Sequence, residues 1–216
     1  MARHLCVADI QSNPACIATS ISMPSGLQVT FRPLTADDAG ILGQYFQSLS
    51  QDTRRRFAPH AFDQVTADHL CAAIDYADTI TMIATVQDGP EERMVAYFIC
   101  VLGVAAVERA RYAQAGISLD PHTDCTVAPS VADAYQDRGL GSSLMSHLIQ
   151  VARELGRRRV VLMGGVQATN HRALHYYQKH GFREVNTFEG PPGAYNHDMV
   201  LDLGPGCSHS WGLVPP

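Results

Sequence analysis

The sequence of 216 residues has little of three things: surplus positive charge, paired cysteines and long apolar runs. Its net charge of −5 argues against a general nucleic-acid binder, because such proteins need a basic face. The six cysteines include no Cys-x-x-Cys pair, so neither a zinc site nor a disulfide framework is expected. No segment reaches the ~18 apolar residues of a membrane span. We therefore expect a cytoplasmic protein that binds neither membrane nor nucleic acid.

What is present is a balanced globular composition, with 46% hydrophobic and 17% charged residues. A chain of this length can form one domain with a substantial core. We expect that domain to span residues 28–203. Residues 1–27 are interrupted by prolines and could form an arm, an extra strand or a disordered leader. Residues 204–216 are rich in Gly and Pro, which predicts a loop or a disordered tail.

The hydrophobic pattern predicts strands that alternate with helices. Strands are expected at residues 29–32, 80–86, 94–107, 125–131, 159–163, 182–186 and 198–203. Helices are expected to begin near Thr35 and Thr66 and to occupy residues 142–155 and 170–180. The segments 54–57 and 109–120 read as loops. Such an order predicts an α/β fold with helices on both faces of one sheet.

The loop from Gln136 to Gly141 separates a predicted strand from a predicted helix. The first turn of a helix leaves backbone N–H groups unpaired and carries partial positive charge, which favours an anion. Gly139 and Gly141 lack a Cβ, so the backbone can approach a ligand closely. No Gly-Lys-Ser/Thr follows, and Leu144 replaces the last glycine of a dinucleotide-binding loop. The loop alone is compatible with a phosphate site or with an ordinary turn.

A second motif lies downstream, at Asn170, Ala173, Tyr177, Lys179, Gly181 and Phe182. Together with the loop Gln136-x-x-Gly139-x-Gly141, it resembles the GNAT superfamily of acyl-CoA-dependent N-acetyltransferases. The resemblance is densest over residues 126–185. It implies a mixed, mostly antiparallel central sheet flanked by helices, in which a splayed strand pair holds acyl-CoA. Acetyl-CoA is the implied cosubstrate, and no metal is implied.

By this resemblance, acyl-CoA would bind to the edge of the strand before the loop and to the loop itself. The edge corresponds to Val131, Ala132 and Asp133, and the Val131 amide would face the thioester oxygen and stabilise an oxyanion. The pyrophosphate would lie on the loop and the first helical turn, which comprise Gln136, Asp137, Arg138, Gly139, Leu140, Gly141 and Ser142. Asn170 would cap its helix, bond the pantetheine amides, or do both.

The resemblance also implies that Tyr177 is the general acid that faces the coenzyme sulfur. Tyr176 lies ~100° away around the helix and is expected to point elsewhere. A lysine-type amine has a pKa of ~10.4, so a base or a desolvating pocket must remove its proton near neutral pH. Asp124, on the strand before the loop, is one candidate base. His122, Glu108 and water are the alternatives.

We therefore expect an acetyl-CoA-dependent N-acetyltransferase in which a primary amine attacks directly within a ternary complex. Cys125 has no identifiable histidine partner, which argues against an acyl-enzyme. Residues 29–86 resemble GNAT domains attached to bacterial protein-lysine acetyltransferases, which suggests a protein or peptide amine beside small-molecule amines. The link at 54–57 is then a candidate acceptor-side loop. The family often forms homodimers, and a non-catalytic acyl-CoA-binding regulatory module is the alternative function.

Overall fold

One nine-stranded sheet organises this computed structural model, which describes residues 5–190 and 193–204. The strands lie in the order β1-β2-β3-β4-β5-β6-β9-β7, and β8 pairs with β9. Their bounds are β1 (Thr19–Ser22), β2 (Gln28–Pro33), β3 (Thr79–Asp88), β4 (Glu91–Val101), β5 (Asp124–Val131), β6 (Arg159–Leu162), β7 (Val166–Gln167), β8 (Arg183–Glu189) and β9 (Tyr195–Asp202). The β5–β6 pair is parallel and the other strand pairs just described are antiparallel. The expected mixed, mostly antiparallel sheet is confirmed.

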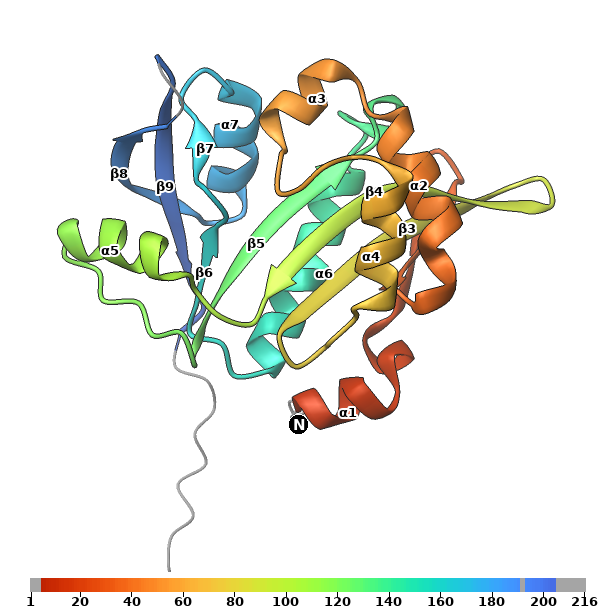
Figure 1. Cartoon of the computed structure of the whole chain (residues 1–216), viewed down its shortest axis with the longest axis horizontal. Coiled ribbons are helices and arrows are strands. Elements are labelled where there is room, and N and C mark those ends of the chain that lie inside the picture. Colours follow the sequence, from red (N-terminus) through yellow and green to blue (C-terminus); the bar gives the residue numbers. More distant parts are fainter. Residues whose placement is uncertain (1–4, 191–192, 205–216) are drawn as a thin grey trace, which may run out of the picture.

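Helices cover both faces of this sheet (Figure 1). They are α1 (Val7–Ser12), α2 (Ala39–Ser48), α3 (Gln51–Arg56), α4 (Gln64–Ala72), α5 (Ala106–Gln114), α6 (Leu140–Glu154) and α7 (His171–Lys179). In β6, Val160 and Leu162 pack in the cluster that contains α6, whereas Val161 packs in the cluster that contains α5. Because alternate residues of a strand face opposite sides, α5 and α6 lie on opposite faces. No helix in residues 5–190 or 193–204 is long and apolar enough to cross a membrane.

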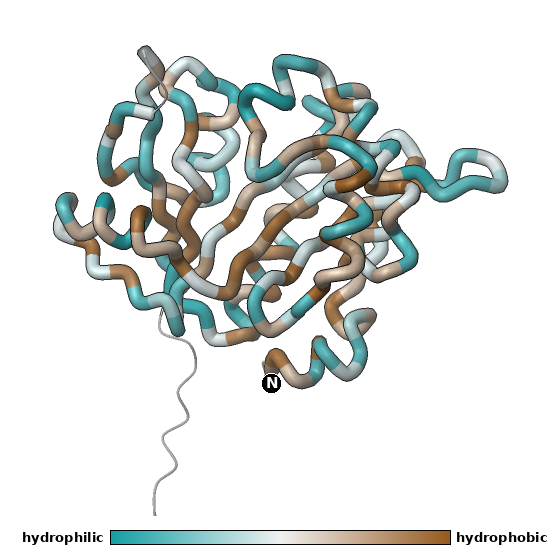
Figure 2. Tube along the Cα trace, in the orientation of Figure 1, coloured by the Kyte–Doolittle hydropathy of each residue, from teal (hydrophilic) through white to brown (hydrophobic). Residues whose placement is uncertain are grey.

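The α6 helix is fixed against the sheet by one apolar stripe. Its buried positions are Leu140, Leu144, Met145, Leu148, Ile149, Val151 and Ala152. Burying an aliphatic side chain of this size contributes about 1.5 to 3 kcal/mol, so the stripe holds the helix firmly on the central strands. Figure 2 shows hydrophobic residues along those strands and a hydrophilic β3–β4 turn. The stripe therefore sets where the N-terminus of α6 points.

The β5 strand is paired unequally on its two sides. Its ladder with β4 continues to Val131, whereas its parallel ladder with β6 ends at the pair Val127–Leu162. The last bond on the β6 side runs from the Met163 N–H to the Val127 carbonyl, at 3.0 Å. Beyond it, the backbone from Ala128 to Val131 has one free edge. The split is favoured by Pro129, which has no N–H to offer a ladder.

Two predicted segments differ from the structure. The strand expected at 94–107 ends at Val101, and the expected loop at 109–120 contains most of α5. The reason is tertiary: Tyr112 is fully buried and its hydroxyl donates to the Met199 carbonyl at 2.7 Å, which fixes this segment as a helix against β9. The apolar residues before it belong to the turn that enters this helix.

The acceptor-side region also differs from its prediction. Residues expected to form a loop at 54–57 belong mostly to α3, whose N-cap Ser50 accepts a bond from the Thr53 N–H. The α4 helix starts before Thr66, because Asp63 is its N-cap and accepts from the Thr66 N–H at 2.8 Å. Both starts follow the usual capping chemistry, at positions that the apolar pattern does not mark.

The N-terminal segment packs on the main body. β1 pairs antiparallel with β2 and becomes an edge of the sheet. The Leu5 N–H donates to the Glu154 carbonyl at 3.3 Å, and a ring nitrogen of His147 lies 2.8 Å from the Ile17 carbonyl oxygen. The predicted tail lies outside the described residues from position 205 onward.

A buried ion pair generates a prediction about stability. Arg111 donates from Nε and Nη2 to the Asp198 carboxylate at 3.0 Å, and its guanidinium lies 4.0 Å from the Phe188 ring centroid. Asp198 is fully buried. Arg111→Met should lower the free energy of unfolding by about 3 to 5 kcal/mol, because it leaves a buried carboxylate unpaired.

Urea unfolding followed by circular dichroism measures this loss. The matched control is Arg93→Met, which removes an exposed partner of Asp88 and should cost about 1 kcal/mol or less. Equal losses in the two variants would contradict the prediction.

Candidate functional site

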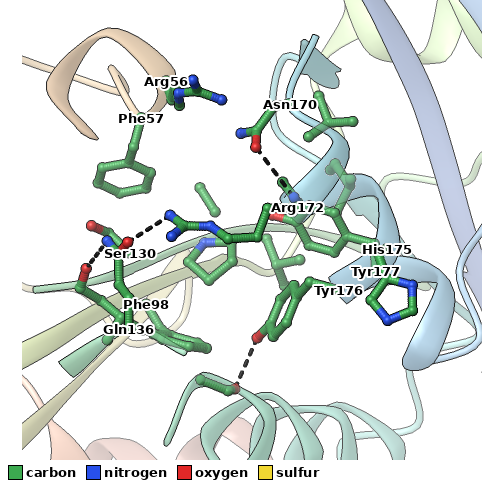
Figure 3. A pocket seen from close by; sticks show the side chains of 18 of the residues that line it. Arg56, Phe57, Phe98, Ser130, Gln136, Asn170, Arg172, His175, Tyr176 and Tyr177 are labelled. Atoms are coloured by element: carbon green, nitrogen blue, oxygen red, sulfur yellow. Dashed lines mark hydrogen bonds between the residues drawn. The ribbon is translucent and has the colours of Figure 1, made fainter. Parts of the chain in front are cut away.

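A cavity of about 360 Å³ occupies the split between β5 and β6 (Figure 3). Its walls come from the end of β5, the loop before α6, the first turn of α6, the β6–β7 turn, α7 and the C-terminal end of α3. The lining residues that matter below are Thr53, Arg56, Phe57, Ser130, Val131, Gln136, Asp137, Gly139, Gly141, Ser142, Met163, Gly165, Asn170, Arg172, Tyr176 and Tyr177. Segments far apart in the sequence therefore meet at one hollow.

The free edge of β5 presents a backbone donor to this cavity. The Val127 carbonyl faces β6, whereas the Ala132 N–H donates to the Val95 carbonyl on β4 at 2.8 Å. Because successive residues of a strand point their polar groups to opposite sides, the Val131 N–H faces the cavity. The Val131 carbonyl already accepts a hydrogen bond from Gln136 Nε2, at 2.8 Å. The N–H is therefore the group available to a bound molecule.

The first turn of α6 supplies further donors. The Ser143 N–H donates to the Gly139 carbonyl at 3.2 Å, but the N–H groups of Leu140, Gly141 and Ser142 have no such backbone partner in the described part of the chain. The loop reaches this turn through two left-handed residues, Asp137 at φ 57° and Gly139 at φ 82°. Unpaired donors and the helix dipole together make this end attractive to an anion.

Arg172 links α7 to the loop and was not identified from the sequence. Its Nη2 donates to Gln136 Oε1 at 2.5 Å and its Nη1 donates to Asp137 Oδ2 at 3.2 Å. The side chain crosses the cavity in Figure 3. It offsets the charge of Asp137, which would otherwise repel a phosphate at the same loop. The only sequence signal was a basic residue two positions after Asn170.

Tyr177 and Tyr176 both line the cavity. Tyr177 is 8% exposed, and burial raises the pKa of its hydroxyl well above the usual value, so this group stays protonated. It makes no hydrogen bond to any residue that the structure describes. Tyr176 was expected to point elsewhere, which is wrong: its hydroxyl donates to the Gly141 carbonyl at 2.8 Å. That bond ties α7 to the start of α6.

Asn170 is the N-cap of α7. Its Oδ1 accepts from the Ala173 N–H at 3.2 Å, while the side chain also lines the cavity. Capping is one of the two roles expected for it. The amide nitrogen is free to face a ligand.

Four residues expected at the coenzyme do not place their side chains in this cavity. Ala132 turns its N–H to β4, and the Leu140 side chain is buried in the core. Arg138 lines a separate, smaller hollow with Leu27 and Tyr135. Asp133 turns toward α3 instead. Strand alternation and helix periodicity, rather than proximity in sequence, decide which neighbours of the motif face the split.

Asp124 also lies away from the cavity, so its position does not fit a general base. It pairs with Arg159 at the start of β5, three pairs before the split opens. Its Oδ2 accepts from the Asp120 N–H at 2.8 Å and lies 3.7 Å from an Arg159 nitrogen. The side chain is 1% exposed, and this burial raises the pKa of Asp124. His122 lies at the same distant end.

Glu108, another candidate base, lies beside the β6–β7 turn. It is buried on α5, and its Oε1 lies 3.4 Å from the Gly164 nitrogen. Gly164 is flanked by Met163 and Gly165, which line the cavity. Glu108 itself does not line it. Its contact therefore supports the wall rather than reaching into the hollow.

The side of the cavity opposite the loop is formed largely by α3 and the residue that follows it. Thr53, Arg56 and Phe57 line this side, together with Ser130, whose Oγ accepts from the Tyr45 hydroxyl at 2.9 Å. Of the expected link at 54–57, Arg56 and Phe57 reach the cavity. Across residues 5–190 and 193–204, no group of three or more His, Cys, Asp or Glu could hold a metal ion.

Comparison with known proteins identifies a matching family and a relative in sequence. Residues 113–182 match the model of the acetyltransferase (GNAT) family. An acetyltransferase of Pseudomonas aeruginosa, PA5475, is 32% identical over 161 residues, which are 71% of this chain and 73% of the relative.

Solved structures share the fold. The GNAT domain of S. lividans PAT has a TM-score of 0.68 and 24% identity, over 88% of this chain and 98% of that domain. The ribosomal-protein-S18-alanine N-acetyltransferase of Escherichia coli has a TM-score of 0.55 and 19% identity, over 85% and 99%. The family match, and above all a relative 32% identical over most of both chains, show that this protein belongs to the acetyltransferase (GNAT) family.

Proposed function

We propose that this protein transfers the acetyl group of acetyl-CoA to a primary amine, by direct attack of the amine within a ternary complex. Members of the family use acetyl-CoA as their cosubstrate. The observation that carries the proposal is that the free edge of β5 and the unpaired N-terminus of α6 open into one cavity. A strand edge and an anion site are what an extended amide chain joined to a pyrophosphate requires.

The dimensions and donors of the cavity fit this ligand. A volume of about 360 Å³ falls within the range of ligand pockets, which is about 300 to 1,000 Å³. The pantetheine arm would lie along the free edge of β5, and the pyrophosphate would accept from the N–H groups of Gly141 and Ser142. Arg172 would supply positive charge beside it, since an arginine binds phosphate oxygens in a planar fork.

The Val131 N–H would donate to the acetyl carbonyl oxygen. A backbone donor aimed at a developing oxyanion is worth about 3 to 4 kcal/mol in the barrier of acyl transfer. As the amine nitrogen bonds to the carbonyl carbon and the C–S bond breaks, the departing sulfur takes up the Tyr177 hydroxyl proton. The proton that leaves the amine passes to water, and the phenolate regains a proton from solvent after the products leave.

The acceptor would enter from the α3 side, between Phe57 and Ser130. The E. coli neighbour is named for the acetylation of an alanine of a ribosomal protein. Together with the resemblance of residues 29–86 to domains of protein-lysine acetyltransferases, this supports a protein or peptide amine. Small-molecule amines remain in the proposed acceptor class.

A non-catalytic acyl-CoA-binding module is the second candidate, and one observation favours it. Asp137 is the only carboxylate among the described residues that line the cavity, and it pairs with Arg172 on the loop side. The acceptor side therefore offers no direct carboxylate base for an amine. A measurement of acetyl transfer to an amine separates the enzyme from the non-catalytic module.

Coenzyme binding should depend on Gly139. Gly139→Val should weaken acetyl-CoA binding by about tenfold or more, because a branched residue disfavours φ 82° and crowds the anion site. Calorimetric titration with acetyl-CoA and with CoA at low phosphate measures the change.

The matched control for this prediction is Gly116→Val. Gly116 has φ 77°, equally open surroundings and a place outside the cavity, so backbone strain is similar but binding should be unchanged. Absence of binding in the unmodified protein would overturn the coenzyme assignment altogether.

Tyr177→Phe should lower kcat by about a hundredfold, because loss of a general acid typically costs that much. The dissociation constant for acetyl-CoA should stay within about twofold, since the phenyl ring still fills the same space. Thiol release is monitored with three probe amines: Nα-acetyl-lysine amide, an alanyl peptide and spermidine.

Asp124→Asn is the companion variant, and kcat should stay within about twofold because the residue lies outside the cavity. Normal turnover in Tyr177→Phe would rule out the acid role, and a large loss in a folded Asp124→Asn protein would restore Asp124 as a candidate base. Tight acetyl-CoA binding with no turnover of protein or small-molecule amines would favour the regulatory module.

A further inference from the structure

Asp133 joins the coenzyme edge to the opposite wall of the cavity. It follows Val131 by two residues and begins the short 3-10 turn Asp133–Tyr135. Its Oδ1 accepts from Thr53 Oγ1 at 2.7 Å and from Ser50 Oγ at 2.9 Å, while its Oδ2 accepts from the Ser50 N–H at 3.0 Å. Burial acts to raise the pKa of Asp133, but these bonds outweigh it and hold the pKa below its usual value.

The C-terminal part of α3 is bonded to β7, on the β6 side of the split. Gln167 on β7 donates from Nε2 to the Arg55 carbonyl at 3.2 Å. Arg54 holds the helix to α2, since its Nη2 donates to the Phe46 carbonyl at 2.7 Å. Six residues form α3, which is too short to be stable alone. Its place across the open end of the split (Figure 1) therefore depends on these ties.

The contacts of Asp133 bear directly on the lining of the acceptor side. Thr53 both donates to Asp133 and lines the cavity. Arg56 and Phe57 lie one helical turn further along and line it too. Figure 3 shows these two residues over the hollow, across from Asn170. Contacts that fix the position of the α3 N-terminus therefore also fix the position of this wall.

We propose that Asp133 is a positioning residue for acceptor binding, which couples the coenzyme edge at Val131 to the acceptor wall on α3. This inference rests on the proposed function. A coenzyme paired with Val131 would immobilise the segment that carries Asp133, and the carboxylate would pass that restraint to Ser50 and Thr53. Coupling between sites is reciprocal, so a bound acetyl-CoA should strengthen acceptor binding. Asp133 itself does not touch the coenzyme.

The test compares Asp133→Asn with Asp63→Asn. The carboxylate of Asp63, like that of Asp133, bonds to the N-terminal turn of a helix, but that helix, α4, contributes nothing to the cavity lining. Asparagine keeps one side-chain acceptor oxygen, so both helices should survive while the negative charge beside each helix N-terminus is lost. For the fastest of the three probe amines, Asp133→Asn should raise the acceptor KM about tenfold, because hydrogen bonds to a charged group contribute on that order. Its kcat and acetyl-CoA affinity should stay within about twofold, and Asp63→Asn should change none of them.

Hydrogen exchange provides a readout that needs no acceptor. In the unmodified protein, acetyl-CoA should slow amide exchange across residues 50–57. In Asp133→Asn, this protection should be lost although acetyl-CoA still binds. Gln167→Ala removes the bond between β7 and α3 and should raise the acceptor KM in the same way, which keeps the test informative if Asp133→Asn folds poorly.

Four results would overturn the inference. An unchanged acceptor KM, or unchanged protection of residues 50–57 in Asp133→Asn, would show that no coupling passes through this carboxylate. Weakened acetyl-CoA binding in Asp133→Asn would place Asp133 on the coenzyme instead. A fall in melting temperature equal to that of Asp63→Asn, with normal kinetics, would leave Asp133 with only a structural role at the N-terminus of α3. The proposed function fails separately, if the unmodified protein binds no acetyl-CoA.

Discussion

The early end of the β5–β6 ladder is the constraint on which the site depends. After the pair Val127–Leu162, the two strands part, while β4 still holds β5 as far as Val131. An unpaired strand edge in a protein interior is unfavourable unless its polar groups find partners. Pro129 removes one donor from this edge, and the remaining Val131 N–H faces a cavity large enough for a ligand. The fold thus keeps backbone binding capacity that a continuous sheet would have consumed.

Hydrogen bonds link the segments that surround the split. Arg172 and Tyr176 connect α7 to the loop and to α6, and Gln167 connects β7 to α3. Each is a hydrogen bond between segments that the sheet itself does not join. Such bonds lower the cost of ordering the site when a ligand binds, which favours affinity. The coenzyme side and the acceptor side are parts of one framework.

The sequence was sufficient for the α/β alternation, the loop-to-α6 junction and the α7 motif, because these depend on local patterns such as helical spacing and glycine placement. The mixed, mostly antiparallel sheet was expected only from the family resemblance. It was insufficient where tertiary contacts decide. The α3 and α5 helices are fixed by partners such as Asp133 and Met199 that lie far away in sequence. Asp124 shares a strand with Val131, yet a strand rises about 3.3 Å per residue, so one strand reaches two distant environments. Neither the cross-link by Arg172 nor the turn of Asp133 away from the loop could be read from spacing.

The placement of β1 has a consequence for the integrity of the sheet. β1 is a short strand at the border of the sheet, and it occupies the outer hydrogen-bonding side of β2, a strand whose Val29 and Phe31 are buried. An uncovered edge of that kind is a template on which other chains can assemble. β1 therefore occupies an edge of β2 that another chain could otherwise extend, which gives this strand a structural place separate from the cavity.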